Sequence, residues 1–153
     1  MNIRTAHPQD AKNIARVVNA AFRPERFFID ADRTSPDKVL ALLQKVKFLL
    51  AEESGELVGC VYVELRGERG YFGMLAVNPE KQRSGLGKQL VAAAEEDCRS
   101  NGCLVMDLTI VNLRKELPGL YRHLGYMESG ILPFPSDQHA NQPCHLIQMS
   151  KPL

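Results

Sequence analysis

Two glycines separated by a single residue, Gly85 and Gly87, lie between basic residues at the start of a stretch with helical periodicity. The first N–H groups of a helix have no partners within the helix, and the helix dipole makes that end positive. Because glycine has no Cβ, a glycine-rich turn lets backbone donors approach an anion closely. Arg83 and Lys88 would add positive charge at the rim. The stretch therefore predicts a phosphate-binding turn, and the alternative is a tight turn that binds nothing.

Two common phosphate loops do not fit this stretch. The dinucleotide fingerprint G-x-G-x-x-G would require glycine at Leu90. A P-loop would require glycine at Gln82 and Ser or Thr at Gln89. The pattern that remains is Q-x-x-G-x-G, over residues 82–87.

Hydrophobic periodicity predicts four helices around this turn. Apolar residues recur at helical spacing over residues 14–22, and again after Ser35-Pro36, where serine offers an N-cap and proline a first helical residue. The third helix is expected over residues 85–99, ended by Asn101-Gly102. A short fourth helix is expected around residues 117–123.

Apolar and β-branched runs predict strands at residues 48–51, 57–65, 71–77, 104–111, 126–129 and 145–149. The run 104–111 is apolar on both faces, which is typical of a buried strand that pairs in parallel. With the strand and helix before it, this run would form a crossover unit. Residues 131–143 show no pattern and are expected to form a long loop. We therefore predict one α/β domain over residues 1–153 with a mixed central sheet.

Composition argues against several classes of function. Lys and Arg number 19 against 18 Asp and Glu, so the net charge is only +1 and no overall field attracts nucleic acid or an anionic membrane. No apolar run approaches the roughly 18 residues that would indicate a membrane span, and the N-terminus lacks the apolar core of a signal peptide. The spacing of the four cysteines is not that of a zinc site, so we expect no metal. We expect the cysteines to be reduced thiols in the core of a cytoplasmic protein. The four are Cys60, Cys98, Cys103 and Cys144.

The Q-x-x-G-x-G stretch resembles the acyl-coenzyme A binding motif of the GNAT superfamily of N-acetyltransferases. Residues 120–126, LYRHLGY, are similar to the later Y-x-x-x-G-[FY] segment of that family. The order of the expected elements also matches the family across nearly the whole chain. The resemblance implies a single-domain GNAT-like fold with a mixed central β-sheet, helices on both faces, and acetyl-CoA as cosubstrate.

The resemblance also implies which residues bind acetyl-CoA. The pyrophosphate would rest on backbone amides of the glycine turn. The pantetheine arm would pair with the motif strand, where that strand splays from the next parallel strand. The residues expected at the cofactor are Leu75, Ala76, Val77, Gln82, Arg83, Ser84, Gly85, Leu86, Gly87 and Lys88. Asn112 is a further candidate, although the family's N-x-x-A pattern before the tyrosine is replaced here by RKEL over residues 114–117.

Acetyl transfer to an amine requires a neutral nucleophile and a proton for the departing thiolate. Deprotonating an amine of pKa near 10.4 at neutral pH costs roughly 4.6 kcal/mol, which a base or a shifted pKa must offset. By the resemblance, Tyr121 donates the proton to the sulfur, and its alternative role is core packing. Residues 71–77 contain no acid, so the candidate bases are Glu64, Asp107 and an ordered water. Without that role, Glu64 would be an exposed carboxylate and Asp107 a buried, hydrogen-bonded one.

The sequence thus predicts an enzyme that moves acetyl from acetyl-CoA directly to an amine of a small molecule, an antibiotic-like compound or a protein. The sequence does not identify the acceptor, because the segments expected to form its cleft have the least regular pattern. Residues that could contact it are Phe27, Phe28, Arg33, Phe134, Asp137 and His139. Two alternatives are a non-catalytic acyl-CoA-binding sensor and an interaction domain with an empty turn. The oligomeric state also stays open, with a homodimer as one option.

Overall fold

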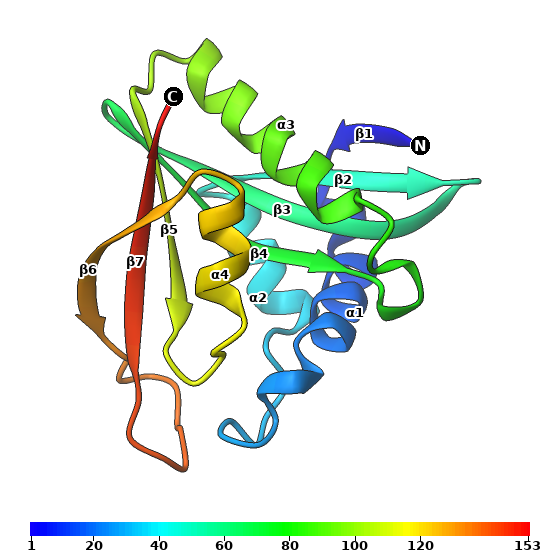
Figure 1. Ribbon diagram of the computed structural model, residues 1–153. Coiled ribbons are helices and arrows are strands. Elements are labelled where there is room, and N and C mark those ends of the chain that lie inside the picture. The colour runs from blue at the N-terminus through cyan, green and yellow to red at the C-terminus, as the bar shows by residue number, and fades with distance from the viewer.

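One mixed β-sheet runs through the molecule, and the computed structural model describes all of residues 1–153 (Figure 1). The seven strands lie in the order β1-β2-β3-β4-β5-β7-β6. Along the chain the strands are β1 (Asn2–Thr5), β2 (Lys47–Glu53), β3 (Glu56–Arg66), β4 (Arg69–Val77), β5 (Val105–Val111), β6 (Met127–Pro133) and β7 (His145–Pro152). The helices are α1 (Ala11–Ala21), α2 (Pro36–Leu43), α3 (Leu86–Ser100) and α4 (Leu117–His123). The predicted mixed α/β fold is confirmed.

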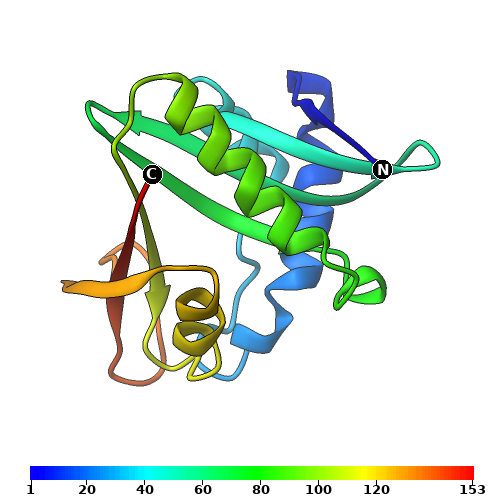
Figure 2. The same ribbon diagram turned by 45° about the horizontal axis from the view of Figure 1, so that its top comes forward.

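Helices cover both faces of the sheet, as expected. In Figures 1 and 2, α3 and α4 lie on one face, and α1 and α2 lie on the other. Side chains alternate along each strand, so β2 contributes Leu49 and Ala51 to the core under α3, and Phe48 and Leu50 to the core under α1 and α2. The apolar face of each helix closes one of these two cores.

Local sequence determines where the helices begin. The Ser35 hydroxyl accepts a hydrogen bond from the Lys38 N–H at 3.2 Å and caps α2, which starts at Pro36. Gly85 precedes α3 with a φ of +83°, in the left-handed region that favours glycine. Pro118 lies in the first turn of α4, where its missing N–H would have had no helical partner. All three predicted starts are confirmed.

The pairing between β4 and β5 ends early, and this early end opens the sheet. The two strands are parallel and pair only from Arg69 with Val105 to Tyr71 with Asp107. Beyond Tyr71, β4 pairs only with β3, while β5 continues along β7 as far as Val111. The two strands therefore separate, which is the splay that the family resemblance implied.

A β-bulge in β4 lies beside this opening. Cys60 pairs with Ala76 and Tyr62 with Gly73, so β4 carries one more residue than β3 between these pairs. Met74, within the bulge, has a φ of +47°, which is uncommon for a residue with a side chain. The bulge therefore changes the direction of β4 at the edge of the opening.

Two expectations need correction. Residues Ile131–Pro133 were assigned to the long loop, but they continue β6, since Ile131 pairs with Ile147 and Pro133 with His145. Cys144 is half-buried, whereas the other three cysteines lie in the core.

None of the helices is both long and apolar enough to cross a membrane.

Candidate active site

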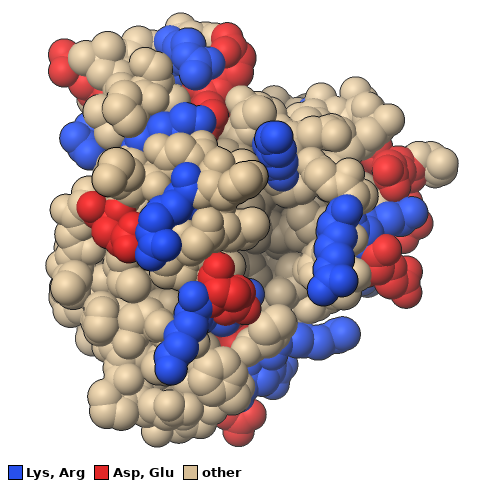
Figure 3. Space-filling model, viewed as in Figure 1, with Lys and Arg blue, Asp and Glu red and all other residues tan.

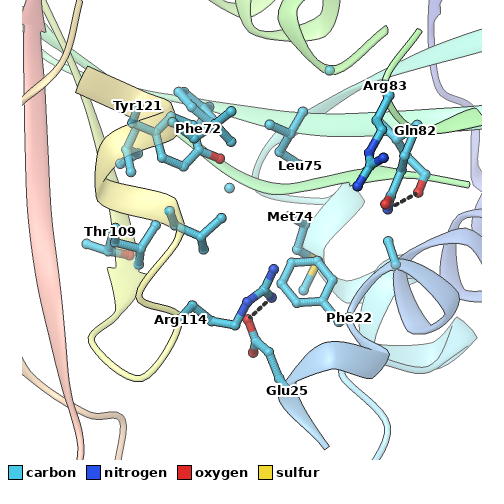
Figure 4. A pocket seen from close by; sticks show the side chains of 18 of the residues that line it. Phe22, Glu25, Phe72, Met74, Leu75, Gln82, Arg83, Thr109, Arg114 and Tyr121 are labelled. Carbon is cyan, nitrogen blue, oxygen red and sulfur yellow. Dashed lines mark hydrogen bonds and ion pairs between the residues drawn. The ribbon is translucent and has the colours of Figure 1, made fainter. Parts of the chain in front are cut away.

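A cavity of about 330 Å³ lies where β4 and β5 separate. Figure 3 shows a hollow on the corresponding face of the molecule, with Lys and Arg side chains on both sides of it. Its walls come from the end of α1, the bulged part of β4, the turn before α3, β5, and α4 with the loop before it (Figure 4). The cavity therefore gathers segments that are up to about 100 residues apart in the chain, from Ala21 to Tyr121.

The β4 wall presents an open strand edge to the cavity. Residues 72–75 and Val77 line it, and no strand pairs with β4 on that side beyond Tyr71. Such an edge offers backbone donors and acceptors to an extended ligand, in the way that an added strand would use them. Ala76 does not line the cavity, because it points to the opposite face and is buried in the core under α1.

The glycine turn forms the end of the cavity next to α3. Gln82, Arg83 and Gly87 line it. The turn is tightly folded, with Arg83 at a φ of +69° and the Gln82 side-chain amide donating to the Val77 carbonyl at 3.2 Å. A Cβ added at Gly87 would have only Val77 Cγ2 near it, at 3.7 Å. The protein itself therefore leaves room for a side chain at Gly87, and the space that such a side chain would occupy belongs to the cavity.

The other predicted residues of the turn contribute in different ways. Leu86 is buried in the core beneath α3. The Ser84 hydroxyl donates to the Lys81 carbonyl at 2.6 Å, which stabilises the turn from inside. Ser84, Gly85 and Lys88 lie beside the cavity without lining it.

Tyr121 reaches the cavity from α4. Its ring is 7% exposed and packs against Phe72 and Tyr126, each with ring centroids 6.1 Å away. The hydroxyl makes no hydrogen bond within the protein, in contrast to Tyr126, whose hydroxyl donates to Glu95 at 2.6 Å. Burial raises the pKa of Tyr121 to about 12, although the positive charge of Arg114 opposes the shift. At neutral pH the cavity therefore holds a protonated phenol with a free O–H donor.

The candidate bases and Asn112 lie elsewhere. Glu64, on β3, is outside the cavity and pairs with Arg66. Asp107 accepts hydrogen bonds from Arg69 at 2.7 and 2.8 Å and from Ser150 at 2.5 Å. Burial opposes ionisation of Asp107, but these donors lower its pKa overall. Asn112 holds the start of β7, because its Oδ1 accepts from the His145 N–H at 2.8 Å. None of the three side chains faces the cavity.

The cavity also contains a charged pair that the sequence did not indicate. Arg114, in the loop before α4, donates to Glu25 at 3.1 Å, and the two side chains are only 14% and 12% exposed. Figure 4 shows this pair across the cavity from Tyr121 and Phe72. Glu25 lies in a short 3₁₀ turn, Arg23–Glu25, that follows α1. Because 89 positions separate the partners and the turn has no periodic pattern, nothing in the sequence connected them.

A second hollow of about 660 Å³ adjoins the first, and Met74 lines both. Its walls are residues 29–34 and 137–141, with part of α2. Of the six residues predicted to contact the acceptor, Arg33, Asp137 and His139 line this hollow, whereas Phe27, Phe28 and Phe134 do not. Thr34 also lines it, and the buried Thr34 hydroxyl has no hydrogen-bond partner.

A sequence model described as "Acetyltransferase (GNAT) family" matches residues 14–126. The chain belongs to the GNAT acetyltransferase family. This membership agrees with the glycine turn, the open β4 edge and the tyrosine of α4, all of which lie within the matched residues. The chain is thus an acetyltransferase, and enzymes of this family use acetyl-CoA.

Solved structures share the GNAT fold over almost the whole chain. A ribosomal-protein-alanine N-acetyltransferase from Brucella melitensis is 21% identical, with 100% of both chains covered and a TM-score of 0.79. The ribosomal-protein-S18-alanine N-acetyltransferase from Escherichia coli is 17% identical, with 99% of this chain and 92% of that chain covered and a TM-score of 0.77. The PaiA N-acetyltransferase from Thermoplasma acidophilum, solved with coenzyme A, is 16% identical over 100% of both chains with a TM-score of 0.76. At such identities the likeness is one of fold.

No group of three or more His, Cys, Asp or Glu side chains is arranged to hold a metal ion. The polar groups at the first cavity are the Tyr121 phenol, the Glu25–Arg114 pair, Thr109, Lys81 and the residues of the glycine turn. These groups can bind an anion, donate a hydrogen bond and accept a proton.

Proposed function

We propose that this acetyltransferase moves an acetyl group from acetyl-CoA directly to an acceptor amine in the cavity between β4 and β5. The observation that carries the proposal is the early end of β4–β5 pairing at Tyr71, which leaves an open strand edge beside Tyr121 and the glycine turn. The three features that the family resemblance required thus border the same cavity. Beyond Tyr71 the backbone groups on this edge of β4 have no strand partner, so they are free to bond an extended ligand.

The described residues fit acetyl-CoA. The first amides of α3 and the Arg83 side chain offer positive charge for the pyrophosphate, and Gly87 leaves the space free. The edge of β4 at Leu75 and Val77 offers backbone groups to the amide-containing pantetheine arm. Leu108, Ile110 and Leu117 provide an apolar wall opposite. Acetyl-CoA supplies the activated acetyl thioester.

Tyr121 is proposed as the group that assists departure of the thiolate. A complete proton transfer from a phenol of pKa about 12 to a thiolate of pKa about 8.5 is uphill by about 5 kcal/mol. We therefore assign Tyr121 a hydrogen bond to the sulfur that strengthens as negative charge develops, with proton transfer completed as the C–S bond breaks. The free hydroxyl fits this role, because no protein acceptor competes for its proton.

The acceptor is proposed to enter from the second hollow. Met74 lines both spaces, so an amine can reach the first cavity while the rest of the acceptor stays between residues 29–34 and 137–141. The volume of about 660 Å³ suits a small molecule or the end of a peptide. Both classes have precedents among structures of this fold, since one neighbour is a ribosomal-protein-alanine N-acetyltransferase and another a nourseothricin acetyltransferase.

The test combines cofactor binding with turnover. Acetyl-CoA at about 100 times its dissociation constant should stabilise the fold by roughly 2.7 kcal/mol, a clear rise in melting temperature. Thiol release and a mass increase of the acceptor should then be followed with an alanine-initiated peptide, nourseothricin and spermidine. Binding with no turnover across a wide amine panel would support the non-catalytic sensor. If acetyl-CoA does not raise the melting temperature, both the acetyltransferase proposal and the sensor alternative are contradicted.

A further inference from the structure

An acceptor that arrives as an ammonium ion must lose a proton before it can attack, and the first cavity contains one carboxylate. Glu25 is the only Asp or Glu among the residues that line it. Glu64 is outside and pairs with Arg66, and Asp107 is saturated by Arg69 and Ser150. The two carboxylates that the sequence suggested are thus unsuited by position, while a third lies at the cavity.

The geometry of Glu25 leaves one of its oxygens free. Arg114 donates to Oε2 at 3.1 Å, and Oε1 makes no hydrogen bond within the protein. The turn backbone is fixed, since the Glu25 carbonyl accepts from the N–H groups of Phe28 and Ile29 at 3.1 and 3.0 Å. The carboxylate is therefore held in place by its ion pair and its backbone, with one oxygen available to a ligand. In Figure 4 it lies beside Arg114, across the cavity from Tyr121.

We propose that Glu25 is the general base of this acetyltransferase, an inference that rests on the proposed function. Glu25 Oε1 takes a proton from the acceptor ammonium, directly or through one water, and the free amine then forms the new N–C bond. As that bond forms the C–S bond breaks, the thiolate receives the Tyr121 proton, and the amide nitrogen loses its surplus proton to restore the phenol. Glu25 finally releases its proton to solvent, so that one proton is produced for each acetyl group transferred.

The charges around Glu25 suit this role. Burial is the largest influence and raises its pKa, whereas Arg114 and Arg33 act in the opposite direction and Glu116 adds to the rise. The net direction is upward, so Glu25 is a stronger base than an exposed carboxylate. The ion pair with Arg114 still favours the ionised form that can accept a proton. Burial and Arg114 thus have opposite effects on the pKa of the Glu25 carboxyl group.

The first experiment replaces Glu25 and compares it with a carboxylate outside the cavity. Glu25→Gln should lower kcat by at least about a hundredfold with the fastest acceptor of the panel above, and kcat should then rise steadily with pH towards the pKa of the amine instead of levelling off above the pKa of Glu25. The matched control, Glu64→Gln, should keep the parental kcat and the parental fall of kcat at acidic pH, which is called the acidic limb below. Hydroxylamine, which is largely neutral at pH 7, should be acetylated by Glu25→Gln with a much smaller loss, because it needs no base to become a nucleophile.

The second experiment leaves Glu25 in place and changes its partner. Arg114 lowers the pKa of Glu25, so Arg114→Met should raise it and move the acidic limb of kcat to higher pH. A purely structural ion pair would not move that limb. If Glu25→Gln retains the parental kcat and acidic limb while still showing the acetyl-CoA thermal shift, Glu25 is not the base and the proposed function stands. If Glu25→Gln fails to fold, an unmoved limb in Arg114→Met overturns the inference by itself.

Discussion

The first cavity and the hollow that adjoins it are built differently. The wall proposed to bind acetyl-CoA, called the cofactor wall below, is formed by β4, residues 82–87 and α3, which are held by a strand ladder and by helix packing. The acceptor wall, formed by residues 29–34 and 137–141 of the hollow proposed for the acceptor, is irregular and is held by single hydrogen bonds. Examples are Asn141 N–H to the Phe28 carbonyl at 2.8 Å and Thr34 N–H to Asn19 Oδ1 at 2.9 Å.

The difference reflects what each wall has to bind. Regular elements pair their own backbone groups, so their positions follow from a periodic sequence and stay fixed for a cosubstrate common to the family. An irregular segment must find its partners one at a time, through side chains such as Asn19, which bonds both the N–H and the carbonyl of Thr34. Such segments can vary without disturbing the sheet, which suits a site where related enzymes accept different amines.

The largest expected effect is on the cofactor wall. Gly87→Glu would place a negative side chain in the space proposed for the pyrophosphate, so the dissociation constant for acetyl-CoA should rise by about a hundredfold or more. Isothermal titration calorimetry measures it. Gly119→Glu is the control, because Gly119 is exposed on α4 with nothing within 4 Å of an added Cβ. Parental affinity in folded Gly87→Glu would show that the phosphates bind elsewhere.

The next effect separates chemistry from binding on the same wall. Tyr121→Phe keeps the ring against Phe72 and removes only a hydroxyl without a protein partner, so stability and acetyl-CoA affinity should change little. The kcat should fall by about a hundredfold or more, with little change in KM. The loss should shrink when acetyl is carried on a thiol of lower pKa. Unchanged kcat would leave Tyr121 with a packing role only.

A smaller effect concerns stability beneath that wall. Tyr126 is fully buried and its hydroxyl donates to Glu95, which also pairs with Lys151 at 3.1 Å. Tyr126→Phe should lower the free energy of unfolding by about 1–3 kcal/mol, because a buried carboxylate loses a donor. Urea denaturation measures this, while kcat should stay near the parental value. A large loss of kcat at unchanged stability would reverse the roles assigned to the two tyrosines.

The smallest effect is expected on the acceptor wall. Thr34→Val removes a buried hydroxyl without a partner and keeps the backbone bonds to Asn19, so stability should stay within about 1 kcal/mol of the parent or rise. The KM for the acceptor should increase several-fold, and acetyl-CoA affinity should not change. A stability loss as large as that of Tyr126→Phe would mean that this hydroxyl supports the wall.

Much of the fold and half of the site could be predicted from local pattern. The starts of α2, α3 and α4 follow from Ser35-Pro36, Gly85 and the periodic run around Tyr121. The motif gave the glycine turn and Tyr121, and both reach the cavity. The prediction was weaker wherever a side chain's orientation decided its role, as for Ala76, which lies on the strand expected to bind acetyl-CoA but faces the opposite core.

The sequence by itself determined the helices, most of the strands, the glycine turn and the place of Tyr121, because each depends on residues within a few positions of one another. Only the tertiary structure decided which carboxylate faces the cavity. Glu64 and Asp107 meet Arg66 and Arg69 on the sheet, whereas Glu25 meets Arg114 from 89 positions away. The Glu25–Arg114 pair exists because the folded chain brings the turn after α1 next to the loop before α4. Contacts of this kind leave no periodic trace in the sequence, since they depend on the path of the whole chain.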